Sequence, residues 1–108
     1  MTKPTDLVQG TLDLLLLKIL ALEAMNGWSI SQRLRQTSSD VLQVSDGSLY
    51  PALHKLELEG TVESYEGVEK GRTRRYYRIT KAGRAELAKG RKEWSQVSRA
   101  VSLILKQA

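Results

Sequence analysis

The segment from Val44 to Gly60 combines an apolar helical face with several hydrogen-bonding side chains. Leu49, Leu53 and Leu56 recur at the spacing of one helix face. The side chains that fall largely off this face carry hydroxyl, imidazole or ammonium groups, and they are Ser48, Tyr50, His54 and Lys55. These groups are suited to hydrogen bonds with phosphates and with the edges of bases. We therefore predict a helix whose polar face contacts duplex DNA.

A basic segment follows this helix. Residues 70–84 hold seven Lys and Arg and no acidic residue, whereas the rest of the chain has 10 basic against 12 acidic residues. Positive charge concentrated in one element is expected where a polyanion docks, although a solvated, charged pair of strands would look the same. Because the helix lies just upstream, we favour nucleic acid. We expect Arg72, Arg74 and Arg75 to contact DNA, the first two at the minor groove or at flanking phosphates.

Two helices are expected to precede and support the DNA-contacting helix. The first covers Leu7–Ala24, and the second covers Trp28–Thr37 after a turn at Asn26-Gly27. In the second helix, Trp28, Ile30 and Leu34 should point inward. Residues 41–44 are a candidate for a very short strand.

The ends of the third helix, predicted over Asp46–Glu59, are marked by Ser45 as N-cap and Gly60 as C-cap. Ser45 and Ser48 are also candidate phosphate ligands, because a helix N-terminus attracts anions. The sequence does not decide at which residue this helix begins. A start at Asp46 puts Pro51 inside the helix, where it removes a backbone hydrogen bond, whereas a start near Ser48 puts Pro51 in the first turn.

A β-hairpin is predicted after the third helix. Its strands cover Thr61–Glu66 and Thr73–Ile79, with a loop over Val68–Arg72. Side chains alternate along the second strand, and Tyr77 and Ile79 mark the face toward the core.

The last predicted helix, Lys81–Lys106 with Thr80 as N-cap, carries an apolar seam. Its positions alternate steps of three and four, and they include Leu87, Trp94, Val97, Val101 and Ile104. The first helix is apolar nearly all round, with Leu14 and Leu17 outside its main face. The apolar seam and the nearly all-apolar first helix each need another protein surface to cover them. We predict a homodimer held by these seven residues, although the last helix packing on its own domain is the alternative.

These elements together predict a mainly α fold with a small β-hairpin. We expect a winged helix-turn-helix DNA-binding domain over residues 1–80 and a C-terminal dimerisation helix over residues 81–108.

The chain resembles the PadR family of bacterial transcriptional regulators, in the short form with a single C-terminal helix. The motifs that carry the resemblance stand in family order at Asp6–Leu20, Asn26–Ile30, Gly47–Gly60 and Arg74–Gly83. The resemblance implies a dimer that binds a palindromic operator, usually as a repressor. Some relatives bind flat aromatic ligands near the dimer interface, so Trp94 is either an anchor of the dimer core or a contact for such an effector. Trp28 stands where the family usually has Tyr, a change that should preserve packing. Thr61 stands where a large apolar residue is common, which predicts looser packing at the entry to the hairpin.

Several function classes are excluded by what the sequence lacks. With no Cys and a single His, no metal site is expected, and no motif for a nucleophile or a phosphate loop supports an enzyme or a cofactor. The apolar run at residues 14–22 is too short to span a bilayer. We expect a soluble, cytoplasmic regulator with no membrane partner. A DNA-independent dimeric interaction module or antirepressor of the same shape is the alternative function.

Overall fold

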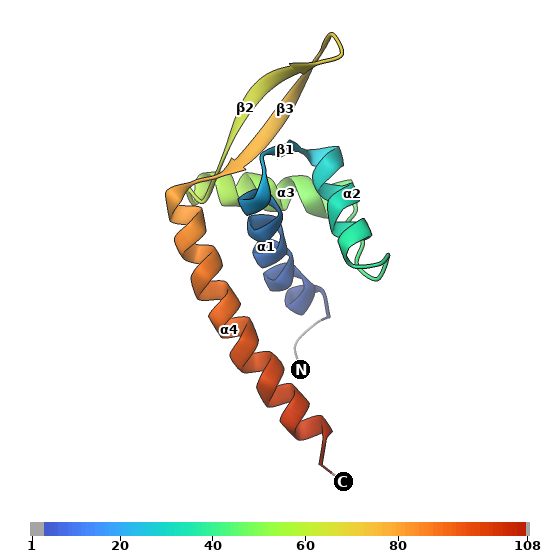
Figure 1. The fold of residues 1–108 in the computed structure, drawn as a ribbon, viewed down its shortest axis with the longest axis vertical. Helices are drawn as coiled ribbons and strands as arrows, with labels where there is room; N and C mark the ends of the chain where they lie inside the picture. The colour runs from blue at the N-terminus through green and yellow to red at the C-terminus, as the bar shows by residue number, and fades with distance from the viewer. Residues whose placement is uncertain (1–3, 108) are drawn as a thin grey trace.

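The computed structural model describes residues 4–107 of the chain, and the side chains of residues 10–107. The elements are α1 (Pro4–Leu22), β1 (Met25–Asn26), α2 (Gly27–Thr37), α3 (Asp46–Leu58), β2 (Val62–Glu69), β3 (Arg72–Ile79) and α4 (Lys81–Leu105). Helices α1 to α3 form a head from which the β2–β3 hairpin projects at one end, while α4 runs toward the other (Figure 1). The predicted mainly α winged-helix fold is confirmed.

The core of the head is aliphatic. Its largest fully buried side chains are Leu16, Leu20, Ile30, Leu49, Leu53, Leu56 and Val62, contributed by the three head helices and the first residue of the hairpin. The face of α3 that the leucine spacing predicted is therefore the face that packs in the core. Burial of these side chains fixes which residues of α3 point out of the molecule.

The start of α2 differs from its prediction. Met25 and Asn26 form a short strand that pairs with Tyr77 and Tyr76 of β3, and the Asn26 side chain caps α2 by accepting from the Ser29 amide at 2.8 Å. The predicted turn at Asn26-Gly27 is therefore a junction between strand and helix. Trp28 does not point inward and is 65% exposed. It precedes the buried Ile30 by two residues, or about 200° of helix, and so lies on the opposite side.

The structure also decides the ends of α3. The helix starts at Asp46, so Pro51 lies inside it, and Ser45 is the N-cap residue. The Ser45 hydroxyl does not cap a backbone amide but bonds the Ser48 hydroxyl at 3.3 Å. At the other end, the C-cap is Glu59 rather than the predicted Gly60, and Gly60, with φ +78°, is the residue after the cap, where glycine commonly ends a helix. Residues 41–44 form no strand, and β1 occupies the edge of β3 that is not paired with β2.

Thr61 is well packed, contrary to its prediction. It is 4% exposed, and its hydroxyl donates to the Leu56 carbonyl at 3.1 Å. The hydrogen bond satisfies the buried hydroxyl, so a polar residue is accommodated where the family usually has an apolar one.

The hairpin is longer than predicted. β2 and β3 pair without interruption from Val62–Ile79 to Glu69–Arg72, leaving Lys70 and Gly71 as the turn. Both turn residues have positive φ, 51° and 75°, as a two-residue type I′ turn requires. The predicted loop over Val68–Arg72 is thus wrong, because this tight turn lets the strands pair to the tip.

Helix α4 is anchored to the head only along its first turns. The Thr80 side chain accepts from the Gly83 amide at 3.0 Å, which confirms the predicted N-cap, and a Cβ at Gly83 would overlap the Thr61 carbonyl oxygen. Leu87 is 8% exposed and Leu17 is 5% exposed, both in the core cluster of the subunit. These two residues were predicted at a dimer interface, but their own chain already covers them.

Candidate nucleic-acid interface

One line of residues on α3 points away from the core. Gly47, Pro51, His54 and Leu58 are all exposed, and they follow one another at steps of four, three and four residues, opposite the buried leucines. His54 therefore lies near the centre of the outward face, as the sequence predicted. The other predicted side chains of α3 lie on the flanks of this line rather than along it.

Tyr50 lies on the flank of α3 nearest to α2. It is 44% exposed, and its ring packs against Gly27, where an added Cβ would stand 2.6 Å from the Tyr50 hydroxyl oxygen. The ring thus joins α3 to the first turn of α2, and it holds the side chain in place while leaving almost half of it accessible. Tyr50 therefore has a packing role in addition to the DNA contact that we predicted.

Lys55 lies on the opposite flank and is directed toward α1. Its ammonium donates to Asp13 Oδ2 at 2.6 Å, and Glu59 lies 3.9 Å away. The hydrogen bond to Asp13, reinforced by the charge of that carboxylate, raises the pKa of Lys55. Sequence reasoning assigned Lys55 to a phosphate, but in this arrangement its charge is used to tie α3 to α1.

Ser45 and Ser48, the two serines at the start of α3, are exposed and face a hollow of about 520 Å³. Residues of α1, α2, the loop before α3 and α4 form the rest of its wall, which includes Leu12, Leu15, Leu34, Leu42 and Trp94. The two hydroxyls bond each other, so each has hydrogen-bonding capacity left for a ligand.

The arginines of the hairpin lie on two faces. The strand register puts Arg72 and Arg74 on one face with Tyr76, and Arg75 on the other with Tyr77. The second face is the one that lies against α3, because the Ser64 hydroxyl donates to the Glu57 carboxylate at 2.8 Å. Burial, followed by the nearby charge of Glu57, raises the pKa of Tyr77 on that face. The three predicted arginines are therefore not one patch.

Ion pairing separates the cations at the hairpin tip from most other cations of the head. Arg33, Arg35, Lys55 and Arg78 each pair with a carboxylate, the last with Glu63 at 2.6 Å. Among the described head residues, the cations with no such pair are Lys18, Lys70, Arg72, Arg74 and Arg75. Four of these five are at the tip of the hairpin, where their charge is available to a polyanion.

Trp28 is a candidate that sequence reasoning missed. Its exposed indole lines a groove of about 460 Å³ between the start of α2 and the hairpin, together with Ser29, Arg72 and Arg74. The apolar character of tryptophan suggested a core position. The signal that would have placed it outside is its distance of two residues from Ile30.

Contacts between side chains stiffen the middle of this hairpin. The Tyr65 and Tyr76 rings stack with centroids 5.6 Å apart, and the Arg78 guanidinium lies 4.9 Å from the centre of the Tyr65 ring. The Tyr76 hydroxyl donates to Glu69 at 2.9 Å, and this bond raises the pKa of Tyr76. These contacts stiffen the hairpin itself, and with it the strand that carries Arg72 and Arg74.

The comparisons with known proteins agree on one family. The sequence model that defines the transcriptional regulator PadR-like family matches residues 16–89 of this chain. This chain belongs to that family. It is 48% identical over 59 residues to the transcriptional regulator Rv3488 of Mycobacterium tuberculosis, covering 55% of each chain. It is 32% identical over 102 residues to an uncharacterised protein of Lysinibacillus sphaericus, covering 94% of each.

Solved structures of transcriptional regulators share the whole fold. A transcriptional regulator from Clostridium thermocellum superposes with a TM-score of 0.87 at 29% identity, covering 94% of this chain and 99% of that one. A PadR-like regulator from Bacillus cereus gives 0.83 at 29% identity, covering 95% and 99%. Members of this family are transcription regulators rather than enzymes, and family membership implies DNA binding.

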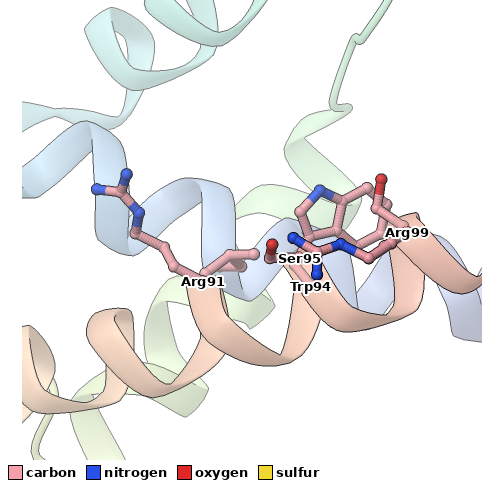
Figure 2. Close-up of a pocket in the computed structure, with 6 residues that line it drawn as sticks. Arg91, Trp94, Ser95 and Arg99 are labelled. Carbon is pink, nitrogen blue, oxygen red and sulfur yellow. The ribbon is translucent and has the colours of Figure 1, made fainter.

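The remaining predicted residues of this PadR-like chain lie along α4 and α1. Trp94, Val97, Val101 and Ile104 are between 49% and 71% exposed, and Leu14 packs against Gly90. Figure 2 shows the indole of Trp94 among Arg91, Ser95 and Arg99, at a hollow of about 470 Å³ that Leu14 and Ser98 also line. Within the described part of the chain no helix is long and apolar enough to cross a membrane, and no group of acidic or imidazole side chains is placed to hold a metal.

Proposed function

We propose that this protein is a repressor that binds a palindromic operator as a homodimer. The observation that carries the DNA-binding part is the pairing pattern of the head cations: Lys70, Arg72, Arg74 and Arg75 are the unpaired group at the tip of a projecting hairpin. Charge that is not neutralised within the protein releases counterions from DNA when it meets phosphates.

In this proposal α3 enters the major groove and the hairpin reaches the neighbouring backbone or minor groove. A major groove about 12 Å wide admits one helix, and the outward line of α3 contains Gly47 and Pro51, which let the helix approach the bases closely. His54 is the side chain on that line able to donate to a base edge or a phosphate. Tyr50 and the two serines at the start of α3 contact phosphates from its sides, and Trp28 with Arg72 and Arg74 holds the backbone beside the hairpin.

The homodimer is supported by the uncovered apolar stripe of α4. Trp94, Val97, Val101 and Ile104 follow the seam spacing, and each is about half exposed or more in the single chain. A stripe of this size left in water is unfavourable, and a second copy offers a matching surface. Two heads related by a two-fold axis then read two half-sites about 34 Å apart, which is why a palindrome is proposed. Repression is the usual role that the family resemblance implies, and we place the protein in the cytoplasm, where bacterial DNA lies.

A small aromatic effector is the second part of the proposal. The 520 Å³ hollow beside Trp94 has walls of leucine side chains and two serine hydroxyls, a composition suited to a flat, mostly apolar molecule. Because the hollow touches both α4 and the start of α3, such a ligand would change the position of the reading helix relative to the dimer helix.

Selection of bound duplexes from random DNA at defined salt tests the function. We expect an inverted repeat whose half-sites are one helical turn apart. Recovery of a single asymmetric site would refute the dimeric mode of binding. If no sequence is enriched, and substitutions at Arg72 and Arg74 leave the affinity for DNA unchanged, the DNA-independent interaction module is favoured.

A further inference from the structure

The net positive charge of the chain lies on α4 rather than on the DNA-binding head. Residues 81–106 contain seven Lys and Arg and two Glu, which leaves ten basic and ten acidic residues in residues 1–80. The head is therefore neutral as a whole, although its hairpin tip is locally basic. The whole net charge of +5 belongs to one helix and its last cap residue.

The α4 cations are also unpaired. All the ion pairs of the described residues lie in the head, and none involves Lys81, Arg84, Lys89, Arg91, Lys92, Arg99 or Lys106. All seven residues are exposed. The two glutamates of this helix leave most of that charge uncompensated, so the helix carries a strong positive potential.

Four of these cations form a line, which we name the α4 cation stripe: Lys81, Lys92, Arg99 and Lys106. At 100° per residue they fall within about 40° of one another, and the stripe spans roughly 37 Å along the helix. The apolar residues of the seam, such as Trp94 and Val101, lie on the opposite side of the helix. A partner copy that covers the seam would thus leave Lys81, Lys92 and Lys106 facing solvent, whereas Arg99 also lines the hollow beside Trp94.

Apart from Lys81, which follows the end of β3 by two residues, the stripe lies too far from the hairpin tip to serve the same DNA. Helix α4 leaves the head in the direction opposite to the hairpin, and the molecule is 59 Å long (Figure 1). Lys92, Arg99 and Lys106 extend from the middle of α4 to its C-terminal cap, away from the hairpin. A duplex held by α3 and the hairpin tip therefore does not reach them.

We propose that the α4 cation stripe binds a second segment of duplex DNA, so that one protein bridges two segments. The inference rests on the proposed function for the first segment. The occupant follows from charge and shape: Lys92, Arg99 and Lys106 repeat every seven residues, about 10.5 Å, along a straight rod. Duplex DNA is a straight polyanion with one charge per roughly 1.7 Å, so it can contact all of them at once. A shallow groove of about 380 Å³ between Lys92 and Arg99 provides room for the phosphates.

The test is a two-duplex capture experiment with the full chain. Protein is bound to a donor-labelled duplex carrying its selected site, and an acceptor-labelled duplex without the site is then added. The stripe variant is K92Q/R99Q/K106Q. The matched control, R84Q/K89Q/R91Q, removes the same charge from the sides of the helix.

We expect the stripe variant to lose capture of the second duplex by at least tenfold, with affinity for the first duplex changed less than twofold. The slope of log K against log salt for the second duplex should fall by about 2.7, at roughly 0.9 for each of three contacts. The control should lose less than threefold.

Three outcomes overturn the inference. Capture that survives in the stripe variant means that a second head holds the second duplex. Equal losses in both variants mean that diffuse charge is responsible. Competition by polyglutamate as effective as by DNA at equal charge means that the stripe takes acidic protein segments. Binding of neither duplex contradicts the proposed function itself.

Discussion

Some arginines of the hairpin form ion pairs within the protein and others do not. This difference predicts how the affinity for DNA depends on salt concentration. Arg72 and Arg74 have no ion pair with a described residue, whereas Arg78 on the same face of the hairpin is bonded to Glu63 at 2.6 Å. If the first two neutralise phosphates, R72Q/R74Q should lower the slope of log K against log salt by about 1.8, at roughly 0.9 per contact. Between 50 and 200 mM salt, this slope difference changes the wild-type to variant affinity ratio about 12-fold.

The measurement is fluorescence anisotropy of a labelled duplex titrated with protein at several salt concentrations in this range. R78Q is the matched control, because it removes one guanidinium from the same face but a guanidinium already used within the protein. Its slope should stay within about 0.3 of the wild type, a third of one phosphate contact. The reasoning is refuted if R72Q/R74Q leaves the slope unchanged, or if R78Q lowers it by as much per residue as the double variant does.

Three further predictions concern packing, assembly and pH. Gly27→Ala should force Tyr50 out of position and weaken operator binding at least tenfold while the melting temperature falls by a few degrees; unchanged binding in a titration would show that the Tyr50 position is unimportant. Val97→Glu should bury an unpaired charge at the seam and give a monomer by analytical ultracentrifugation, and a variant that stays dimeric would remove α4 from the interface. Asp13→Asn should lower stability below pH 10.5, the ordinary pKa of the Lys55 ammonium, by denaturant titration. Because that pKa is raised in the folded state, the advantage of the wild type should be complete below this pH and disappear as the pH rises through the folded value; a difference that does not shrink as the pH is raised above 10.5 would point to another cause.

Local patterns in the sequence were enough to predict most of the fold. Helix periodicity identified the four helices and the buried face of α3, because a face that alternates by three and four residues has only one side to bury. The cap at Thr80 and the helix end at Gly60 were also predictable, since capping depends on residues a few positions apart. The uncovered seam residues of α4 beyond Gly90 follow the predicted spacing too.

The sequence by itself therefore determined the four helices, the buried face of α3 and the family, whereas the tertiary structure decided what each polar side chain of the site does. That Lys55 is held by Asp13, 42 residues away, depends on how α1 crosses α3, which no local pattern encodes. The same holds for Arg78, which strand pairing places beside Glu63, and for Leu87, which is buried in the core of its own chain. Which cations remain free for DNA is a property of long-range packing, because an ion pair forms only after the elements that carry its two charges have come together.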